Sequence, residues 1–220
     1  PVPKTFKEPG KPVPVPVERT GRPYTFKERK LTASELEYWQ QYGITPEILE
    51  QYKVCSVVQF QSENADGNPF SYSSTKEEPI YGYKNKRFIK LYRPFSKTRF
   101  LYGGNIGESY CFGLEQLPSK GDTLFITGGE KDVMSLAAHG FHAICFNSET
   151  VTVPPNIIYK LTFRFKHIIL LYDMDVTGVE SAKKHEKQLC EYGVKRLLLP
   201  LQGTKSEKDI SDYFRAGNSR

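Results

Sequence analysis

Two aspartates stand one residue apart directly after an apolar run at residues 167–172, and a glycine and a helical pattern follow them. Asp173 and Asp175 are therefore expected at the carboxyl end of a strand, where two like charges so close together repel each other. A hard divalent cation relieves that repulsion, and Mg²⁺ is commonly held by one or two carboxylates together with phosphate oxygens. The simpler alternative is that Asp173 caps a turn and Asp175 is solvated. We favour the metal site, because the pattern combines an apolar strand, two acids and a helix start.

Two more acidic segments follow apolar runs. In residues 127–132, Gly128 and Gly129 permit the close approach of a phosphate, and Glu130 offers a carboxylate. Asp209 comes after the last apolar run. Each segment also has a simpler interpretation. Residues 127–132 could be a strand-to-helix turn with an acidic first helical turn, and Asp209 could be a helix N-cap. Because ligands gather at the carboxyl ends of parallel strands, we expect the three acidic sites to converge.

The segments that must position these acids alternate between strand and helix patterns over residues 122–216. We expect strands at 122–129, 141–147, 167–173 and 195–201, and helices at 131–139, 155–165, 177–192 and 209–215. This alternation predicts the α/β class, with an open parallel sheet and flanking helices.

The preceding residues predict a small α+β part. Thr32 and Glu35 form a capping box for a first helix, and Thr45-Pro46-Glu47 begins a second, which together give a helical hairpin over 31–52. Residues 54–117 predict short antiparallel strands at 54–60, 79–95 and 99–105, with a hairpin turn at 84–86. Residues 1–30 contain seven prolines and predict an extended basic linker. The expected domains are thus 1–30, 31–118 and 119–220.

The net charge of +6 is unevenly distributed. Residues 1–30 hold eight Lys or Arg against three Glu, and residues 84–99 hold seven Lys or Arg and no acid, interleaved with aromatic residues. This mixture suits a polyanion with stackable bases, although a solvated pair of strands would look similar. Because alternate strand residues face opposite sides, the cations are separate candidates. The candidate nucleic-acid or nucleotide-binding residues are Lys84, Lys86, Arg87, Lys90, Arg93 and Arg99.

Other classes of protein are disfavoured. No apolar run is long enough to span a bilayer and no signal-peptide pattern opens the sequence, so we expect a cytoplasmic protein without a membrane partner. The four cysteines form no C-x-x-C motif, which argues against a zinc ribbon or a disulfide scaffold, and we expect buried or half-buried thiols.

Three motifs carry a resemblance to a known family. G-G-E-K-D before a helix, D-M-D-V-T-G after a strand and K-D-I-S-D-Y-F near the end resemble the Toprim domain of primases and topoisomerases. R-F-L-Y-G-G-N followed by F-G-L-E-Q-L is similar to the basic subdomain of bacterial-type primases, and Q-Y-G-I-T-P-E resembles a segment of phage-type primase-helicases. The resemblance covers residues 31–216.

The resemblance implies roles for individual residues. Asp173, Asp175 and Asp209 correspond to metal-binding acids, for Mg²⁺ or alternatively Mn²⁺, and Gly129 and Gly178 correspond to motif glycines. Arg99 corresponds approximately to a basic residue that faces nucleic acid or nucleotide. The first motif departs from the family, because Gly128 stands where primases carry the glutamate credited with catalysis. Glu130, two residues on, is the nearest replacement and our candidate catalytic residue.

The function implied is a DNA primase-like nucleotidyltransferase core that synthesises RNA primers from NTPs on single-stranded DNA. A helicase or another replication protein would act with it, either separately or in a longer parent chain. Two alternatives stay open: a Toprim nuclease, and a non-catalytic nucleic-acid-binding module, which Gly128 would suit. A topoisomerase is disfavoured, because the sequence leaves no room for a strand-passage domain with a tyrosine nucleophile.

Overall fold

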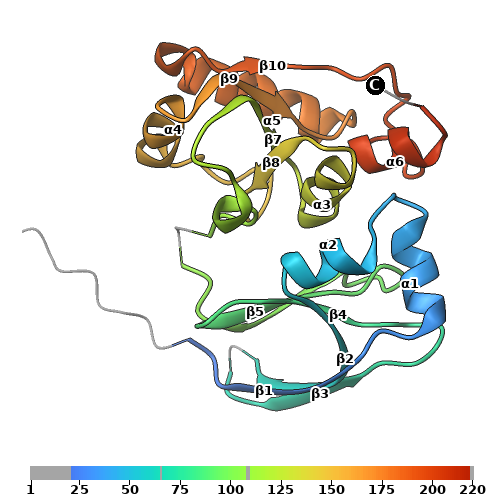
Figure 1. Cartoon of the computed structure of the whole chain (residues 1–220). Coiled ribbons are helices and arrows are strands. Elements are labelled where there is room, and N and C mark those ends of the chain that lie inside the picture. The colour runs from blue at the N-terminus through green and yellow to red at the C-terminus, as the bar shows by residue number, and fades with distance from the viewer. Residues whose placement is uncertain (1–20, 65, 108–109, 219–220) are drawn as a thin grey trace, which may run out of the picture.

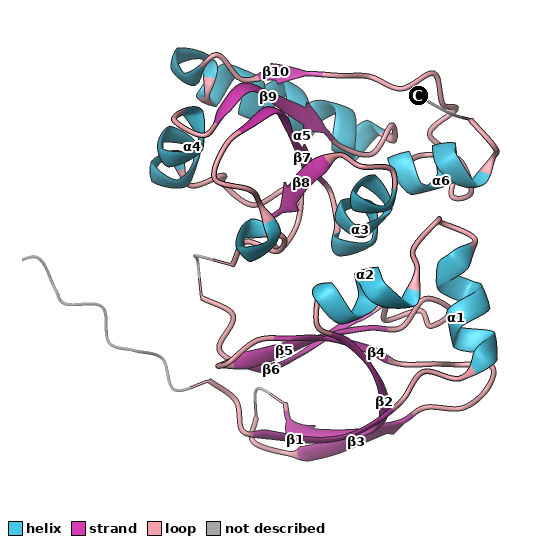
Figure 2. Cartoon of the chain, in the orientation of Figure 1, coloured by secondary structure: helices cyan, strands magenta, loops and turns pink. Residues whose placement is uncertain are grey.

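The computed structural model describes residues 21–64, 66–107 and 110–218, and its elements form two stacked parts (Figure 1). One part is an antiparallel sheet with two helices, and the other is a parallel sheet with helices around it (Figure 2). The expected α/β class, with an α+β part ahead of an open parallel sheet, is therefore confirmed. Residues 1–20 of the predicted linker lie outside the described residues.

The antiparallel part extends from residue 24 to residue 104. Its elements are β1 (Tyr24–Arg29), α1 (Ala33–Gln40), α2 (Pro46–Gln51), β2 (Val54–Glu63), β3 (Pro69–Ser73), β4 (Tyr81–Lys84), β5 (Phe88–Tyr92) and β6 (Phe100–Gly104). The strands follow the order β1-β2-β4-β5-β6, and β3 pairs with β2. The predicted helical hairpin is present, and Thr32 and Glu35 form the predicted capping box at the start of α1.

The parallel part follows a short 3₁₀ helix at Leu114–Gln116. Its elements are β7 (Gly121–Thr127), α3 (Glu130–Ala138), β8 (His142–Cys145), α4 (Pro155–Thr162), β9 (Phe165–Leu171), α5 (Val176–Gln188), a 3₁₀ helix (Cys190–Tyr192), β10 (Lys195–Arg196) and α6 (Ile210–Arg215). The strand order is β10-β9-β7-β8, so β7 and β9 are central. Loops after these two strands therefore meet at the middle of the carboxyl edge.

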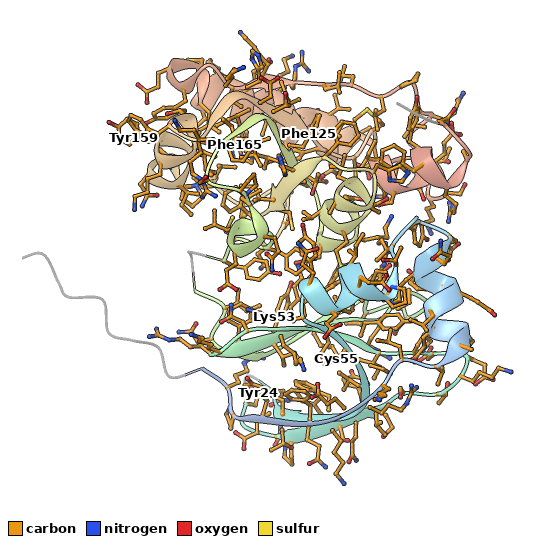
Figure 3. The ribbon with its side chains drawn as sticks, in the orientation of Figure 1. Tyr24, Lys53, Cys55, Phe125, Tyr159 and Phe165 are labelled. Carbon is orange, nitrogen blue, oxygen red and sulfur yellow. The ribbon has the colours of Figure 1, made fainter. Side chains whose placement is uncertain are left out.

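One hydrophobic core joins the two parts. Trp39 and Leu49 of the helical hairpin belong to the same buried cluster as Met134 and Leu136 of α3, and α2 lies between the antiparallel sheet and α3 (Figure 1). Two further clusters fill the remaining parts of the molecule. In Figure 3, Cys55 marks the antiparallel part and Phe165 the parallel part. The shared cluster holds the antiparallel sheet against the carboxyl edge of the parallel sheet.

Three predictions about the strands need correction. Residues 24–29 belong to β1 rather than to the linker, because Tyr24 and Phe26 alternate with polar residues and pack on β2, where Tyr24 lies against Phe60. Strand β3, at residues 69–73, was not predicted. The last strand of the parallel sheet is only two residues long, and Leu197 and Leu198, which the sequence assigns to it, are half exposed beyond its end.

All four cysteines are free thiols. Cys55 and Cys145 are buried and Cys111 is half-buried, whereas Cys190 is exposed and corrects the expectation that all four would be covered. Among the described residues, no helix has the length and apolar character needed to cross a bilayer.

Candidate active site

Three aspartates converge at the carboxyl edge of the parallel sheet. Asp132 lies in the first turn of α3, Asp173 follows β9, and Asp209 precedes α6, and each offers a carboxylate oxygen within 4.8 Å of the others. Three carboxylates at this spacing are the oxygen donors that a hard divalent cation prefers. The donor set therefore fits a bound Mg²⁺ or Mn²⁺.

Local structure explains how two of these acids reach each other. The turn at Gly128 and Gly129 ends β7 and starts α3, which puts Asp132 above the sheet edge. Asp209 is the N-cap of α6 and accepts a hydrogen bond of 2.8 Å from the amide of Asp212. Helices α3 and α6 lie side by side (Figure 2), and the hydroxyl of Ser211 donates to Asp132 over 2.5 Å. The packing of these two helices thus brings Asp132 to Asp209.

Two lysines compensate the charge of the three aspartates. Lys131 donates to both carboxylate oxygens of Asp209 at 3.0 Å, and Lys208 lies 2.5 Å from Asp173. Burial raises the pKa of Asp132 well above its ordinary value, and the neighbouring Asp209 raises it further. Burial also raises the pKa of Asp173, although Lys208 opposes this shift. The carboxylates of the cluster thus repel one another, and a bound cation would relieve this repulsion.

Asp175 lies outside this cluster of three. It is the N-cap of α5 and accepts a hydrogen bond of 3.0 Å from the amide of Gly178, while Lys208 lies 2.8 Å from its other oxygen. Although burial opposes the change, the hydrogen bond from Lys208 lowers the pKa of Asp175. Gly178 permits this geometry, because a Cβ atom there would overlap the main-chain oxygen of Asp173. The metal role of Asp175 stays a prediction from the sequence.

The acidic edge faces the antiparallel sheet across a cavity of about 340 Å³. Asp132, Asp173 and Asp209 lie on one wall. The opposite wall carries two cations and several aromatic rings, namely Lys90, Arg99, Tyr83, Tyr92, Phe100 and Tyr102. Phosphates and bases are the groups that such a wall can contact.

Glu130 lines the same cavity but is engaged by two other side chains. Lys90 of β5 lies 2.7 Å from its carboxylate, and the hydroxyl of Tyr110 donates to the same oxygen over 2.6 Å. All three side chains are buried. The predicted catalytic role of Glu130 is untested, and its observed contacts are those of a residue that joins the two parts of the molecule.

The six predicted nucleic-acid-binding cations lie in different places. Lys90 and Arg99 line the acidic cavity, where Arg99 also donates to the hydroxyl of Tyr92 over 3.2 Å. Arg93 is buried, pairs with Glu78 and lies over the ring of Tyr72. The β4–β5 hairpin carries the other three: Lys84, which pairs with Glu28, and Lys86 and Arg87, which are exposed. The structure therefore brings two of the six to the acids.

Sequence reasoning missed several groups at this site. Asp132 stands two residues after Glu130 in the same motif, so the spacing could have identified it. Lys131 and Lys208 flank motif acids and could also have been found. Glu149, in the loop after β8, lines the cavity as well, and no sequence signal marks it.

Comparisons with known proteins concern the family and the fold of this chain. Residues 125–214 match the family model described as Toprim-like. No match is found among the curated proteins.

Solved structures show the fold over more of the chain. The primase fragment of the bacteriophage T7 primase-helicase protein has 18% identity and a TM-score of 0.56, over 81% of this chain and 68% of that one. The DnaG primase catalytic domain bound to single-stranded DNA has 16% identity and a TM-score of 0.62, over 87% and 72%. A DNA primase domain from Pseudomonas aeruginosa has 16% identity and a TM-score of 0.61, over 85% and 68%. The resemblance to Toprim-domain primases is thereby confirmed.

Proposed function

We propose that this chain, which carries a Toprim-like region within the fold of primase catalytic cores, synthesises RNA primers from NTPs on a single-stranded DNA template. The observation that carries the proposal is the cavity, in which Asp132, Asp173 and Asp209 face a wall of cations and aromatic rings. Each wall matches one part of the substrates. The aspartates suit a hard cation and the phosphates bound to it, and the aromatic rings suit nucleobases.

Asp132, Asp173 and Asp209 would hold the divalent cation, Mg²⁺ or alternatively Mn²⁺. A bound cation would neutralise charge on the triphosphate and lower the pKa of the attacking 3′ hydroxyl. Lys131 and Lys208 hold the aspartate side chains in place through ion pairs. They also keep the net charge of the edge low, so that the aspartates can lie close together before the cation binds.

The opposite wall would hold the nucleotide and the template. Phe100 and Tyr102 are each more than one third exposed, so the exposed part of each ring would contact bases, while Phe100 also stacks on Tyr92. Arg99 lies beside them and carries a planar guanidinium that suits a phosphate. Lys90 would position Glu130 and would not contact a phosphate itself, because its amine is buried in the ion pair with Glu130.

The proposed partners follow from the same reaction. They are single-stranded DNA, NTPs and a helicase or another replication protein. The T7 structure comes from a primase-helicase protein, and one DnaG structure contains single-stranded DNA. These two relatives support the proposed partners of this chain.

One observation favours a second candidate, a non-catalytic nucleic-acid-binding module. Gly128 occupies the position at which the Toprim motif of primases carries its first glutamate, so an acid credited with catalysis is missing from that position. Such a module would keep the basic and aromatic wall and bind single strands without synthesis.

The decisive experiment is incorporation of labelled NTPs on single-stranded DNA with Mg²⁺, compared between the wild type and Asp173→Asn. Primase activity predicts short RNA products that disappear with chelator and with the variant. Shortening of the DNA instead would indicate a Toprim nuclease. Binding without synthesis or cleavage would indicate the non-catalytic module. Circular dichroism of the variant controls for misfolding.

A further inference from the structure

The space beside Gly128 is bordered by two carboxylates, which come from the segments that follow two different strands. A Cβ atom built at Gly128 would lie 3.1 Å from an oxygen of Asp173 and 3.1 Å from Oε2 of Glu149. Any side chain at position 128 would therefore start in tight contact with both acids. Glycine leaves this space to the two carboxylates.

The strand order explains how Glu149 reaches this position. Gly128 follows β7, which lies between β9 and β8 in the sheet. Asp173 follows β9 and Glu149 lies in the loop after β8, so the two acids approach the end of β7 from opposite sides. Without a side chain at position 128, the carboxylate of Glu149 can extend over the end of β7 towards Asp173.

The contacts of Glu149 are incomplete. Its Oε2 atom is buried and has no hydrogen-bond partner among the described residues, although the main-chain amide of Asp173 lies against the carboxylate. No ion pair of Glu149 is found within the described part of the chain. A buried carboxylate oxygen without a partner costs free energy, and such atoms occur where a ligand completes the site.

Glu130 does not offer an equivalent oxygen. The carboxylate oxygen that it shares with Lys90 and Tyr110 is already satisfied by two short contacts. Glu149 has neither partner, and its unsatisfied oxygen lies beside the aspartate cluster. Of the two glutamates in this cavity, Glu149 is therefore the one available to a cation.

We propose that Glu149 supplies the acidic site with the carboxylate that Gly128 cannot provide, and that it binds the divalent cation together with Asp132, Asp173 and Asp209. The inference rests on the proposed function only in taking this cluster as a cation site. The acid that completes the site would then come from the loop after β8 instead of from the end of β7.

The test measures binding of Mn²⁺ alone, by calorimetric titration and electron paramagnetic resonance, without nucleotide or DNA. Glu149→Gln keeps the size of the side chain and should weaken Mn²⁺ binding about tenfold or more, as loss of a metal-supporting residue commonly does. Asp173→Asn serves as the positive control. Glu180→Gln, on an exposed position of α5, is the matched negative control.

A second variant tests the relocation directly. Gly128→Glu with Glu149→Ala frees the space beside position 128 and returns the carboxylate to the end of β7, so it should recover most of the Mn²⁺ affinity that Glu149→Ala alone loses. Wild-type affinity in Glu149→Gln, or no Mn²⁺ binding by the wild type, would overturn the inference. If Glu149→Gln weakens Mn²⁺ binding but the wild type makes no primers, only the proposed function fails.

Discussion

The amine of Lys90 on β5 and the carboxylate of Glu130 at the start of α3 lie 2.7 Å apart and are almost completely buried. This pair links the antiparallel sheet to the parallel part, and Lys90 also donates to the main-chain oxygen of Asn147 beyond β8 over 3.0 Å. Burial opposes the charge of Lys90, but the neighbouring Glu130 outweighs it and raises the pKa of the lysine. The two walls of the cavity are thus joined by a charged contact as well as by the apolar core.

Breaking this pair on one side should be strongly destabilising. Lys90→Met and Glu130→Gln should each lower the free energy of unfolding by about 3–5 kcal/mol, because each leaves a buried group without its partner. The double variant should lose much less than the sum of the two. Urea unfolding of the four proteins measures this coupling, and additive losses would contradict it.

The same variants test the role of Glu130 in the proposed reaction. If Glu130 positions the two walls, Lys90→Met and Glu130→Gln should lower the rate of primer synthesis to similar extents. A loss of orders of magnitude in Glu130→Gln alone, with Lys90→Met close to wild type, would instead support the catalytic role predicted from the sequence. Rates are compared at saturating Mg²⁺ and at a temperature where all variants are folded.

Much of the fold could be predicted because its signals are local. The apolar runs of β7 and β9, the capping box at Thr32 and the hairpin turn between β4 and β5 each depend on neighbouring residues. Strand β1 was missed because its polar alternation follows a proline-rich segment, and only pairing with β2 reveals it. The last parallel strand is shorter than its apolar run, because pairing with β9 stops after Arg196 while the chain continues towards α6.

The site could be predicted in part for the same reason. Asp173 and Asp209 follow apolar runs, so the sequence placed both at the sheet edge. Glu130 and Asn147, which accept hydrogen bonds from Lys90, lie 40 and 57 residues away in the chain, and the burial of Lys90 depends on the packing of the two parts. Glu149 comes from a loop without a motif, and its importance depends on the missing side chain at Gly128. Contacts of this kind can be identified only in the folded chain.

Removal of one acid should stabilise the protein when no metal is bound. Asp132→Asn keeps an oxygen that can accept the hydrogen bond from Ser211 and removes repulsion from Asp209, which Lys131 can then balance. In chelator, we expect a gain on the order of 1 kcal/mol, or about 2–4 °C in Tm. The increase in Tm that Mn²⁺ causes in the wild type should shrink in the variant. A lower Tm in chelator would show that the charge of Asp132 is needed for folding.

Asp175 should contribute more to the stability of α5 than to binding of the cation. Asp175→Ala removes the helix cap and should cost about 0.5–2 kcal/mol, whereas Asp175→Asn keeps a capping oxygen and should cost less. Asp175→Asn should also weaken Mn²⁺ binding less than Asp173→Asn does, because Asp175 lies outside the cluster of three. Equal losses of Mn²⁺ affinity would restore Asp175 to the set of metal ligands predicted from the sequence.

The salt dependence of single-strand binding should identify which cations contact phosphates. Arg99 lines the cavity, and Lys86 and Arg87 are exposed on the β4–β5 hairpin, whereas Arg93 is buried against Glu78 and Tyr72. Each cation that contacts a phosphate contributes about 0.7 to the slope of log affinity against log salt. Changing Lys86, Arg87 and Arg99 together to alanine should therefore flatten the slope by about 2.

Two single variants complete this experiment. Arg93→Ala should change the slope less than Arg99→Ala does, because its guanidinium already contacts Glu78 and Tyr72. Lys183→Ala, at an exposed position of α5, should leave the slope unchanged. Fluorescence anisotropy of labelled single-stranded DNA across a salt series gives each slope. An unchanged slope in the triple variant would move the phosphate contacts to other cations, and the same titration on a chain that lacks residues 1–20 then tests the basic segment ahead of β1.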